Sequence, residues 1–236
     1  MHYVLSDIHG DREAFERILS LTGIGNNDRL YILGDVIDKG KYGIELLQTI
    51  REMPQCILLP GNHEYMMWST YKGSDRNRAL RIWQNNSCEA TMAAFERLPE
   101  EAQESLLSYL ASLPVQMDVE VGGRAFTLVH AAPMELYETE NRKRRTRTEF
   151  ALWHRMSAST ESPGEKIVIF GHVPTMSLQV TMGNMRIFHG GNKIRIDCGC
   201  GYPWLRGQLG CLRLEDMTEF YSIDGIIAPG NGKERE

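Results

Sequence analysis

Side chains that can bind a metal ion or transfer a proton follow six apolar runs along this chain. A single Asp or His in such a place is common, because Asp often forms a turn or caps a helix. Six repeats of one pattern are hard to assign to packing. Imidazole nitrogens with carboxylate and amide oxygens suit a pair of divalent transition-metal cations. The residues at these run ends are Asp7 with His9, Asp35, Asn62 with His63, His130, His172 and Asp197.

The apolar runs predict the strands that would position these side chains. In sheet proteins the carboxyl ends of strands converge on one crevice, so residues far apart in sequence become neighbours there. We expect Asp35 at the centre of this crevice, and Asp7 and His9, two residues apart, to face one point. The first strands are expected at residues 2–5, 30–33 and 56–59, and helices with one apolar face at 12–21 and 42–53.

The alternation of strand and helix lapses after residue 64. Residues 65–113 predict a helical insertion, which could cover the site or consist of ordinary core helices. The Gly122-Gly123 pair predicts a hairpin between two further strands, so part of the sheet is antiparallel. The other elements expected are strands at 115–121, 125–129, 166–170, 185–188, 194–198 and 211–214, and a helix at 148–156.

Composition restricts the class of protein. The chain has 236 residues, of which 42% are hydrophobic and 24% charged, so it can form one sizeable core, and we expect a single domain over residues 1–229 with a frayed tail at 230–236. A net charge of -5 argues against nucleic-acid binding as the main activity. The absence of a long apolar run or leader predicts a cytoplasmic protein without membrane contact. The five Cys are read as reduced thiols.

The order and spelling of the motifs resemble the metallophosphoesterase superfamily. They are most similar to its phosphoprotein phosphatase branch, and to the compact bacterial and phage-type serine/threonine protein phosphatases in particular. The resemblance implies an α/β fold, a four-layer αββα sandwich of two mixed sheets between helices, known as the calcineurin-like fold. The motifs are Asp7-Ile8-His9-Gly10, Gly34-Asp35-Val36-Ile37-Asp38, Gly61-Asn62-His63-Glu64, His130 and Gly171-His172.

The resemblance also implies two divalent metal ions, with Mn²⁺ expected and iron or Zn²⁺ as alternatives. Asp7 and His9 would bind the first ion, and Asp35 would bridge both. Asn62, His130 and His172 would bind the second. A hydroxide between the ions would attack the phosphorus atom. His63 would be the general acid, with Asp38 orienting its ring, although Asp38 could instead cap the following helix or do both.

Two positions depart from the family pattern. Phosphoprotein phosphatases typically have Arg where this chain has Lys39 and Pro60, so two guanidinium groups that would grip the phosphate are replaced. Lys39, Asn62 and Arg155 are the residues expected to face the phosphate. The basic run at 142–147 is either a solvated surface or a phosphate-steering patch. Cys198, Cys200 and Cys211 lack a fourth metal ligand at a standard spacing, so free buried thiols are favoured.

The predicted function is hydrolysis of phosphoserine or phosphothreonine in proteins. A rival with the same metal core is hydrolysis of a dinucleoside polyphosphate such as diadenosine tetraphosphate. A third alternative, a non-catalytic metal-binding module, would require a damaged ligand set, and every ligand position is intact. The expected partners are therefore a phosphorylated protein or a small phosphoester.

Overall fold

Two mixed β-sheets form the centre of the protein. The computed structural model describes residues 1–157, 160–177 and 184–228. In the first sheet, with the order β11-β10-β9-β1-β2-β3, strands β1, β2 and β3 are parallel, and β9, β10 and β11 are added antiparallel. Its strands are β1 His2–Leu5, β2 Arg29–Ile32, β3 Cys56–Leu58, β9 Gly210–Arg213, β10 Glu219–Tyr221 and β11 Gly225–Ile227.

The second sheet has the order β4-β5-β6-β8-β7. Strands β5, β6 and β8 are parallel, and β4 and β7 pair antiparallel at its two edges. The hairpin predicted at Gly122-Gly123 is confirmed, because Val121 pairs with Arg124 across that turn. The strands are β4 Gln116–Val121, β5 Arg124–Val129, β6 Ile167–Phe170, β7 Phe188–Gly190 and β8 Lys193–Arg195.

Alternating side chains allow the first sheet to pack on both faces. Tyr3 and Leu5 of β1 belong to the core shared with helices, whereas Val4 belongs to the core between the sheets. Successive side chains of a strand point to opposite faces. A continuous apolar run of four residues can therefore fill two cores at once, and its strand is buried on both sides.

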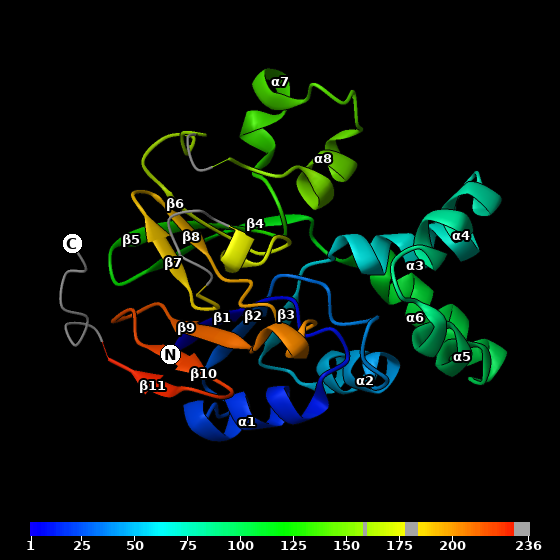
Figure 1. Ribbon diagram of the computed structural model, residues 1–236, viewed down its shortest axis with the longest axis horizontal. Helices are drawn as coiled ribbons and strands as arrows, with labels where there is room; N and C mark the ends of the chain where they lie inside the picture. The colour runs from blue at the N-terminus through cyan, green and yellow to red at the C-terminus, as the bar shows by residue number, and fades with distance from the viewer. Residues whose placement is uncertain (158–159, 178–183, 229–236) are drawn as a thin grey trace.

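Helices cover the outer faces of both sheets. Helices α1 Arg12–Thr22 and α2 Gly43–Glu52 pack on the side of the first sheet that faces away from the second (Figure 1). Helix α8 Arg147–Trp153 packs Phe150 and Ala151 against Val168 and Phe170 of the second sheet. The predicted arrangement of two mixed sheets between helices is confirmed.

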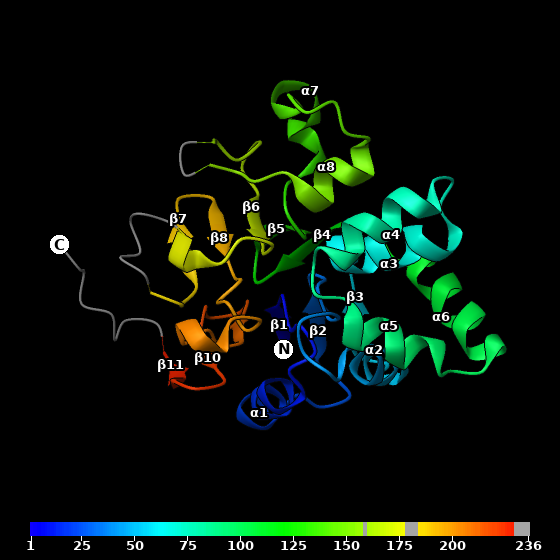
Figure 2. The same cartoon turned by 45° about the vertical axis from the view of Figure 1, so that its right-hand side comes forward.

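Helices fill the segment predicted as a helical insertion, and the first of them begins earlier than residue 65. Its first helix starts at Asn62, so the insertion itself carries two of the candidate site residues. The four helices gather at one end of the molecule in both views (Figures 1 and 2). Their bounds are α3 Asn62–Lys72, α4 Arg76–Gln84, α5 Glu89–Glu96 and α6 Glu100–Ser112.

Three predicted elements are shifted, and one of them is the strand expected at 194–198, which is β8 at Lys193–Arg195 and ends before Asp197. The helix expected at 148–156 ends at Trp153, because His154 is already extended and Met156 turns into the core of the second sheet. Arg155 therefore follows the helix instead of lying on it. The strand expected at 185–188 is replaced by β7 at Phe188–Gly190. Met185 and Ile187 are buried, but their backbone groups form hydrogen bonds with side chains, those of Gln208 and Tyr221.

The predicted tail at 230–236 lies outside the described residues, and the single-domain organisation over 1–229 stays a prediction. Within the described ranges, no helix has the length and hydrophobicity needed to cross a membrane.

Candidate metal centre

The predicted ligands lie just beyond the carboxyl ends of strands in both sheets. Asp7 and His9 follow β1, Asp35 follows β2 by three residues, and Asn62 and His63 begin α3 after β3. His130 follows β5 and His172 follows β6 from the other sheet. The two sheets thus bring their strand ends to one place.

Sharp backbone turns hold several of these residues. Asp7, His9, Asp35, Asp38 and His172 all have positive φ, between 51° and 69°. This left-handed conformation is uncommon for residues other than glycine, although Asp and His adopt it more readily than most. The neighbouring glycines allow the turns to approach one another, because a Cβ on Gly61 would lie 2.0 Å from Asp35 Oδ1.

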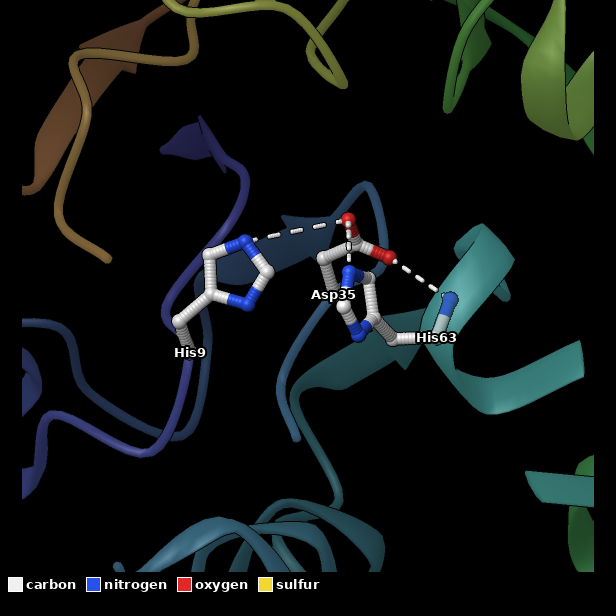
Figure 3. Close-up of side chains that lie close together, drawn as sticks. All are labelled: His9, Asp35 and His63. Carbon is white, nitrogen blue, oxygen red and sulfur yellow. Dashed lines mark hydrogen bonds and ion pairs between the residues drawn. The ribbon is translucent and has the colours of Figure 1, made fainter. Parts of the chain in front are cut away.

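Asp35 lies between two groups of side chains that could each hold a cation. One group is His9, Asp35 and His63, and the other is Asp35, His130 and His172; within each group the candidate ligand atoms lie within 4.8 Å of one another. Figure 3 shows the imidazoles of His9 and His63 next to the Asp35 carboxylate. Its Oδ2 atom is 3.8 Å from His9 Nε2 and 3.5 Å from His130 Nε2. Membership of both groups is the geometry that a bridging ligand requires.

The other predicted ligands flank these groups. Asp7 Oδ1 lies 3.9 Å from His9 Nε2. Asn62 Oδ1 lies 3.0 Å from His130 Nε2 and 2.8 Å from His172 Nδ1, so these three side chains converge on one point. All six predicted ligands are therefore brought together, with Asp7 and His9 on one side of Asp35 and Asn62, His130 and His172 on the other.

Backbone carbonyls fix the orientation of two imidazoles. His9 Nδ1 lies 3.1 Å from the carbonyl oxygen of Ile37, and His130 Nδ1 lies 2.6 Å from that of Leu33. A protonated Nδ1 that donates to a carbonyl leaves Nε2 with a free lone pair, which is how metal-ligating histidines are usually held. In both residues this Nε2 points toward Asp35.

The protonation tendencies fit a cation site. Burial lowers the pKa of His9 well below its ordinary value, and the nearby Lys39 ammonium acts in the same direction. Burial also lowers the pKa of His172, so both rings are neutral, as metal ligands must be. Burial raises the pKa of Asp35 well above its ordinary value, and Asp7 adds like-charge repulsion. Divalent cations would supply the positive charge that keeps these buried carboxylates ionised.

Asp197, the last of the run-end residues, adds a further buried carboxyl. Burial raises its pKa well above the ordinary value, with Asp7 as the next cause. Its Oδ1 accepts a hydrogen bond from the backbone N–H of Gly199 at 2.8 Å. Asp197 thus borders the centre and organises the loop that follows it.

The His63 ring is held by a buried carboxylate. His63 Nδ1 lies 2.6 Å from Asp38 Oδ2, and Asp38 is fully buried. Burial lowers the pKa of His63, but attraction to Asp35 and the hydrogen bond to Asp38 outweigh it, so the pKa is raised above its ordinary value. Of the two alternatives for Asp38, the contact with the His63 ring is observed. Asp38 does not cap α2, because the residue before that helix is Tyr42.

The sequence did not single out Trp83 of α4. Its Nε1–H donates to the same Asp38 Oδ2 atom at 2.7 Å, and the ring is fully buried. Thr91 of α5 accepts from the backbone N–H of Asp38 at 2.9 Å. Among the described residues, the other Asp38 oxygen has no hydrogen-bond partner. The insertion therefore supports the loop that carries Asp38.

Glu64, the last residue of the Gly61-Asn62-His63-Glu64 motif, supports the ligand loops. It is not a member of either cation-binding group. Its buried carboxylate accepts hydrogen bonds from the backbone N–H groups of Asp35, Val36 and Gly61 at 2.7–2.8 Å. Glu64 is the third residue of α3, and it accepts a hydrogen bond from Gly61, the residue just before the helix. This arrangement is half of a capping box, which the spacing of the sequence can predict. Glu64 thus ties two of the ligand loops together.

The two predicted phosphate-binding cations lie on different sides of the centre. Lys39 Nζ is 2.8 Å from His9 Nε2 and 4.1 Å from the ring centroid of Tyr202. Arg155 lines a cleft of about 830 Å³ that also contains Asn62 and His172. Lys39 therefore lies next to His9, whereas Arg155 shares its cleft with Asn62 and His172.

The cysteines stay apart from this chemistry. Cys198, Cys200 and Cys211 are buried and free, as predicted. Burial raises the pKa of all three thiols. In the part of the chain that the structure describes, the groups compact enough to hold an ion contain no cysteine.

Known proteins share this sequence pattern and fold. The model of the calcineurin-like phosphoesterase family matches residues 3–225. A symmetrical bis(5'-nucleosyl)-tetraphosphatase of Acidovorax ebreus is 26% identical over 140 residues, covering 58% of this chain and 46% of that protein. Serine/threonine-protein phosphatase 2 of Salmonella typhimurium is 30% identical over 130 residues, covering 55% of this chain and 57% of that one. The chain thus spans about half the length of these relatives.

A solved structure supports the fold alone. A protein serine/threonine phosphatase from Saccharomyces cerevisiae superposes with a TM-score of 0.57 at 14% identity, covering 99% of this chain and 74% of that one. The family match extends over nearly the whole chain and includes every strand end described above. On this evidence, the chain belongs to the calcineurin-like phosphoesterase family.

Proposed function

We propose that this protein is a phosphatase dependent on two divalent metal ions, and that it hydrolyses phosphoserine and phosphothreonine. Two ions, Mn²⁺ in this proposal, would neutralise the phosphoryl group and acidify the attacking water. The residues that would hold them are Asp7, His9, Asp35, Asn62, His130 and His172, with Asp35 shared between the two ions. Lys39 and Arg155 would attract the phosphate from the two sides of the centre.

The observation that carries the proposal is the pairing of His63 with Asp38. Because Nδ1 is engaged by Asp38, Nε2 is the atom of the His63 ring that would give a proton to the substrate, and in this proposal it does not bind an ion. That atom lies 3.9 Å from Asp35 Oδ2, beside the ligand set. Serine and threonine leave as strongly basic alkoxides unless they are protonated, so a positioned general acid is worth most for these substrates.

The test compares two leaving groups in one variant. His63→Asn should lower kcat/KM on a phosphoserine peptide by about 10²–10⁴-fold, the usual range for general acid catalysis. The loss on p-nitrophenyl phosphate should be visibly smaller, because p-nitrophenolate leaves without a proton. Metal content measured by elemental analysis is the control. Equal losses on both substrates with reduced metal content would instead assign His63 to the metals or the fold.

The second candidate is hydrolysis of a dinucleoside polyphosphate. The relative from Acidovorax ebreus, whose name gives that activity, supports this candidate over 58% of the chain. A nucleoside diphosphate is a much weaker base than an alkoxide, so this reaction has less need of His63. Turnover of a phosphopeptide and of diadenosine tetraphosphate should be measured side by side. A nucleotide rate higher by orders of magnitude would overturn the protein phosphatase proposal.

A further inference from the structure

A strongly basic cleft opens next to the metal centre. It has a volume of about 830 Å³, and Asn62 and His172 form its inner end. We call it the basic cleft. Its cations come from the loop after α7 Tyr137–Glu140 and from the segment after α8. They are Arg142, Lys143, Arg145 and Arg155.

These four cations lack the partners that surface cations usually have. Among the described residues, none of them lies within ion-pair distance of a carboxylate, and Glu140 is the one carboxylate lining the cleft. Arg147 of the same basic run behaves differently, because it pairs with Glu138 at 2.6 Å and does not line the cleft. Within the run, Arg142, Lys143 and Arg145 line the cleft, whereas Arg144 lines the neighbouring groove and Arg147 is paired with Glu138.

The loop that presents the cations is held in a fixed shape. The Asn141 side chain accepts from the backbone N–H of Arg145 at 2.9 Å and donates to its carbonyl at 2.8 Å. Tyr137 Oη donates to the same carbonyl at 2.9 Å. Burial lowers the pKa of Arg145; the negative charge of Glu149 opposes this shift, and the positive charge of Arg155 adds to it. Like charges are therefore held close together by the backbone instead of being free to separate.

One scissile phosphate does not account for this many cations. In the proposed function, two divalent ions, Lys39 and Arg155 would already neutralise that group. Lys143 and Arg145 also line a neighbouring groove of about 840 Å³ between this loop and helices α3 and α4, where Trp68 and Arg78 lie. Five Lys and Arg residues line this groove against two carboxylates, Asp75 and Glu149, so the surface stays positive on balance as it continues away from the centre.

We propose that the basic cleft binds a second anionic group of the substrate, a phosphate or a carboxylate, while the metal centre holds the scissile phosphate. This inference rests on the proposed function and adds a preference for substrates with several negative charges. Arg142, Lys143 and Arg145 are the specificity-determining residues, and Arg155 stands between the two anions. On a phosphoprotein, the second anion would be an acidic or phosphorylated residue near the phosphoserine.

The test uses three phosphoserine peptides that differ only in flanking residues, which are Glu, Gln or Lys. With the metal-loaded enzyme, kcat/KM should be about tenfold higher for the Glu peptide than for the Gln peptide, mainly through KM. Raising the salt concentration should reduce this ratio, because screening weakens exposed charge pairs. The double variant Lys143→Ala with Arg145→Ala should bring the ratio close to one, whereas Arg147→Ala should leave it unchanged.

Failure of this inference and failure of the proposed function give different results. Turnover of the Gln peptide measures the proposed function, and the Glu to Gln ratio measures the inference. A wild-type ratio of one, or a ratio that survives the double variant, overturns the inference. If no peptide is hydrolysed, the same variants are compared on diadenosine tetraphosphate and p-nitrophenyl phosphate. A loss of activity that is larger on the tetraphosphate supports anion binding in the basic cleft, and equal losses on both substrates overturn it.

A binding measurement is independent of turnover. Inorganic tripolyphosphate should bind the wild-type protein in calorimetry about tenfold more tightly than it binds the double variant. Orthophosphate, which carries no second phosphate group, should show a smaller difference. Equal differences for the two anions would count against a second anionic subsite.

Discussion

The hydrogen bond from Trp83 to Asp38 predicts a measurable link between the helical insertion and proton donation. Trp83→Phe keeps an aromatic ring in place but removes the N–H that lies 2.7 Å from Asp38 Oδ2. A hydrogen bond to a charged group contributes about 1.5–3 kcal/mol. The lost ring atoms leave a void, and a void the size of a methyl group costs about 1 kcal/mol.

These amounts set the expected changes. A loss of about 2.5–4 kcal/mol lowers Tm by roughly 5–15 °C in a chain of this length. Asp38 would keep His63 as its partner but with one of two donors gone, so the ring would be less firmly oriented. If about 1.4 kcal/mol of this loss reaches the transition state, kcat on a phosphoserine peptide falls about tenfold.

The assay measures kcat and KM on a phosphoserine peptide and on p-nitrophenyl phosphate below the lower Tm. The loss should fall on kcat and should be larger on the peptide, because only the alkoxide needs the proton. Tyr221→Phe in β10 is the control, since it removes an O–H donor from another fully buried aromatic ring, in the core between the two sheets and outside the site. It should leave the ratio of the two substrates unchanged.

An indole spectrum provides a readout that does not depend on turnover. The chain has four Trp residues, and we expect one exchange-protected Nε1–H signal that disappears in Trp83→Phe and shifts in Asp38→Asn. Equal activity losses on both substrates in Trp83→Phe would show that Trp83 only stabilises the fold. An unprotected Trp83 indole would refute the hydrogen bond itself.

Three further outcomes are expected. Asp35→Asn should bind fewer than two metal ions per chain by elemental analysis and lose most activity, with excess Mn²⁺ giving little rescue; two tightly bound ions would argue against a bridge. Arg155→Ala should raise KM and lower kcat/KM for a phosphopeptide, and unchanged constants would remove it from the phosphate site. Burial raises the pKa of Cys56 to about 12, so its alkylation by iodoacetamide at pH 8.5 should be far slower in the native than in the unfolded protein; similar rates would contradict this.

The metal centre could be predicted from the sequence because its residues follow a local rule. Each one comes just after a short apolar strand, and parallel strands bring such ends to one edge. The strands that carry Asp7, Asp35 and Asn62 lie within one residue of their predicted bounds. The family resemblance then supplied roles that spacing alone does not give.

The supporting residues could not be found in this way. Trp83 lies 45 residues from Asp38 in the sequence, and no local sequence pattern predicts a hydrogen bond over that separation. Helix α8 also ends at Trp153 instead of residue 156, because the burial of Met156 in the second sheet's core overrides the helical spacing around it. Such details depend on which residues pack against each other in the fold, and local sequence patterns do not predict those contacts.

The left-handed turns at the metal centre have a consequence for heat resistance. Such a conformation costs on the order of 1–3 kcal/mol at a residue other than glycine, and Asp and His lie at the lower end of that range. Five such residues therefore cost at least about 5 kcal/mol, which is comparable with the whole net stability of many proteins. Selection for thermal stability alone would replace these residues with glycine and remove the ligands with them. Stabilising this protein without loss of the centre thus requires changes elsewhere in the chain, or cations that bind the native state more tightly.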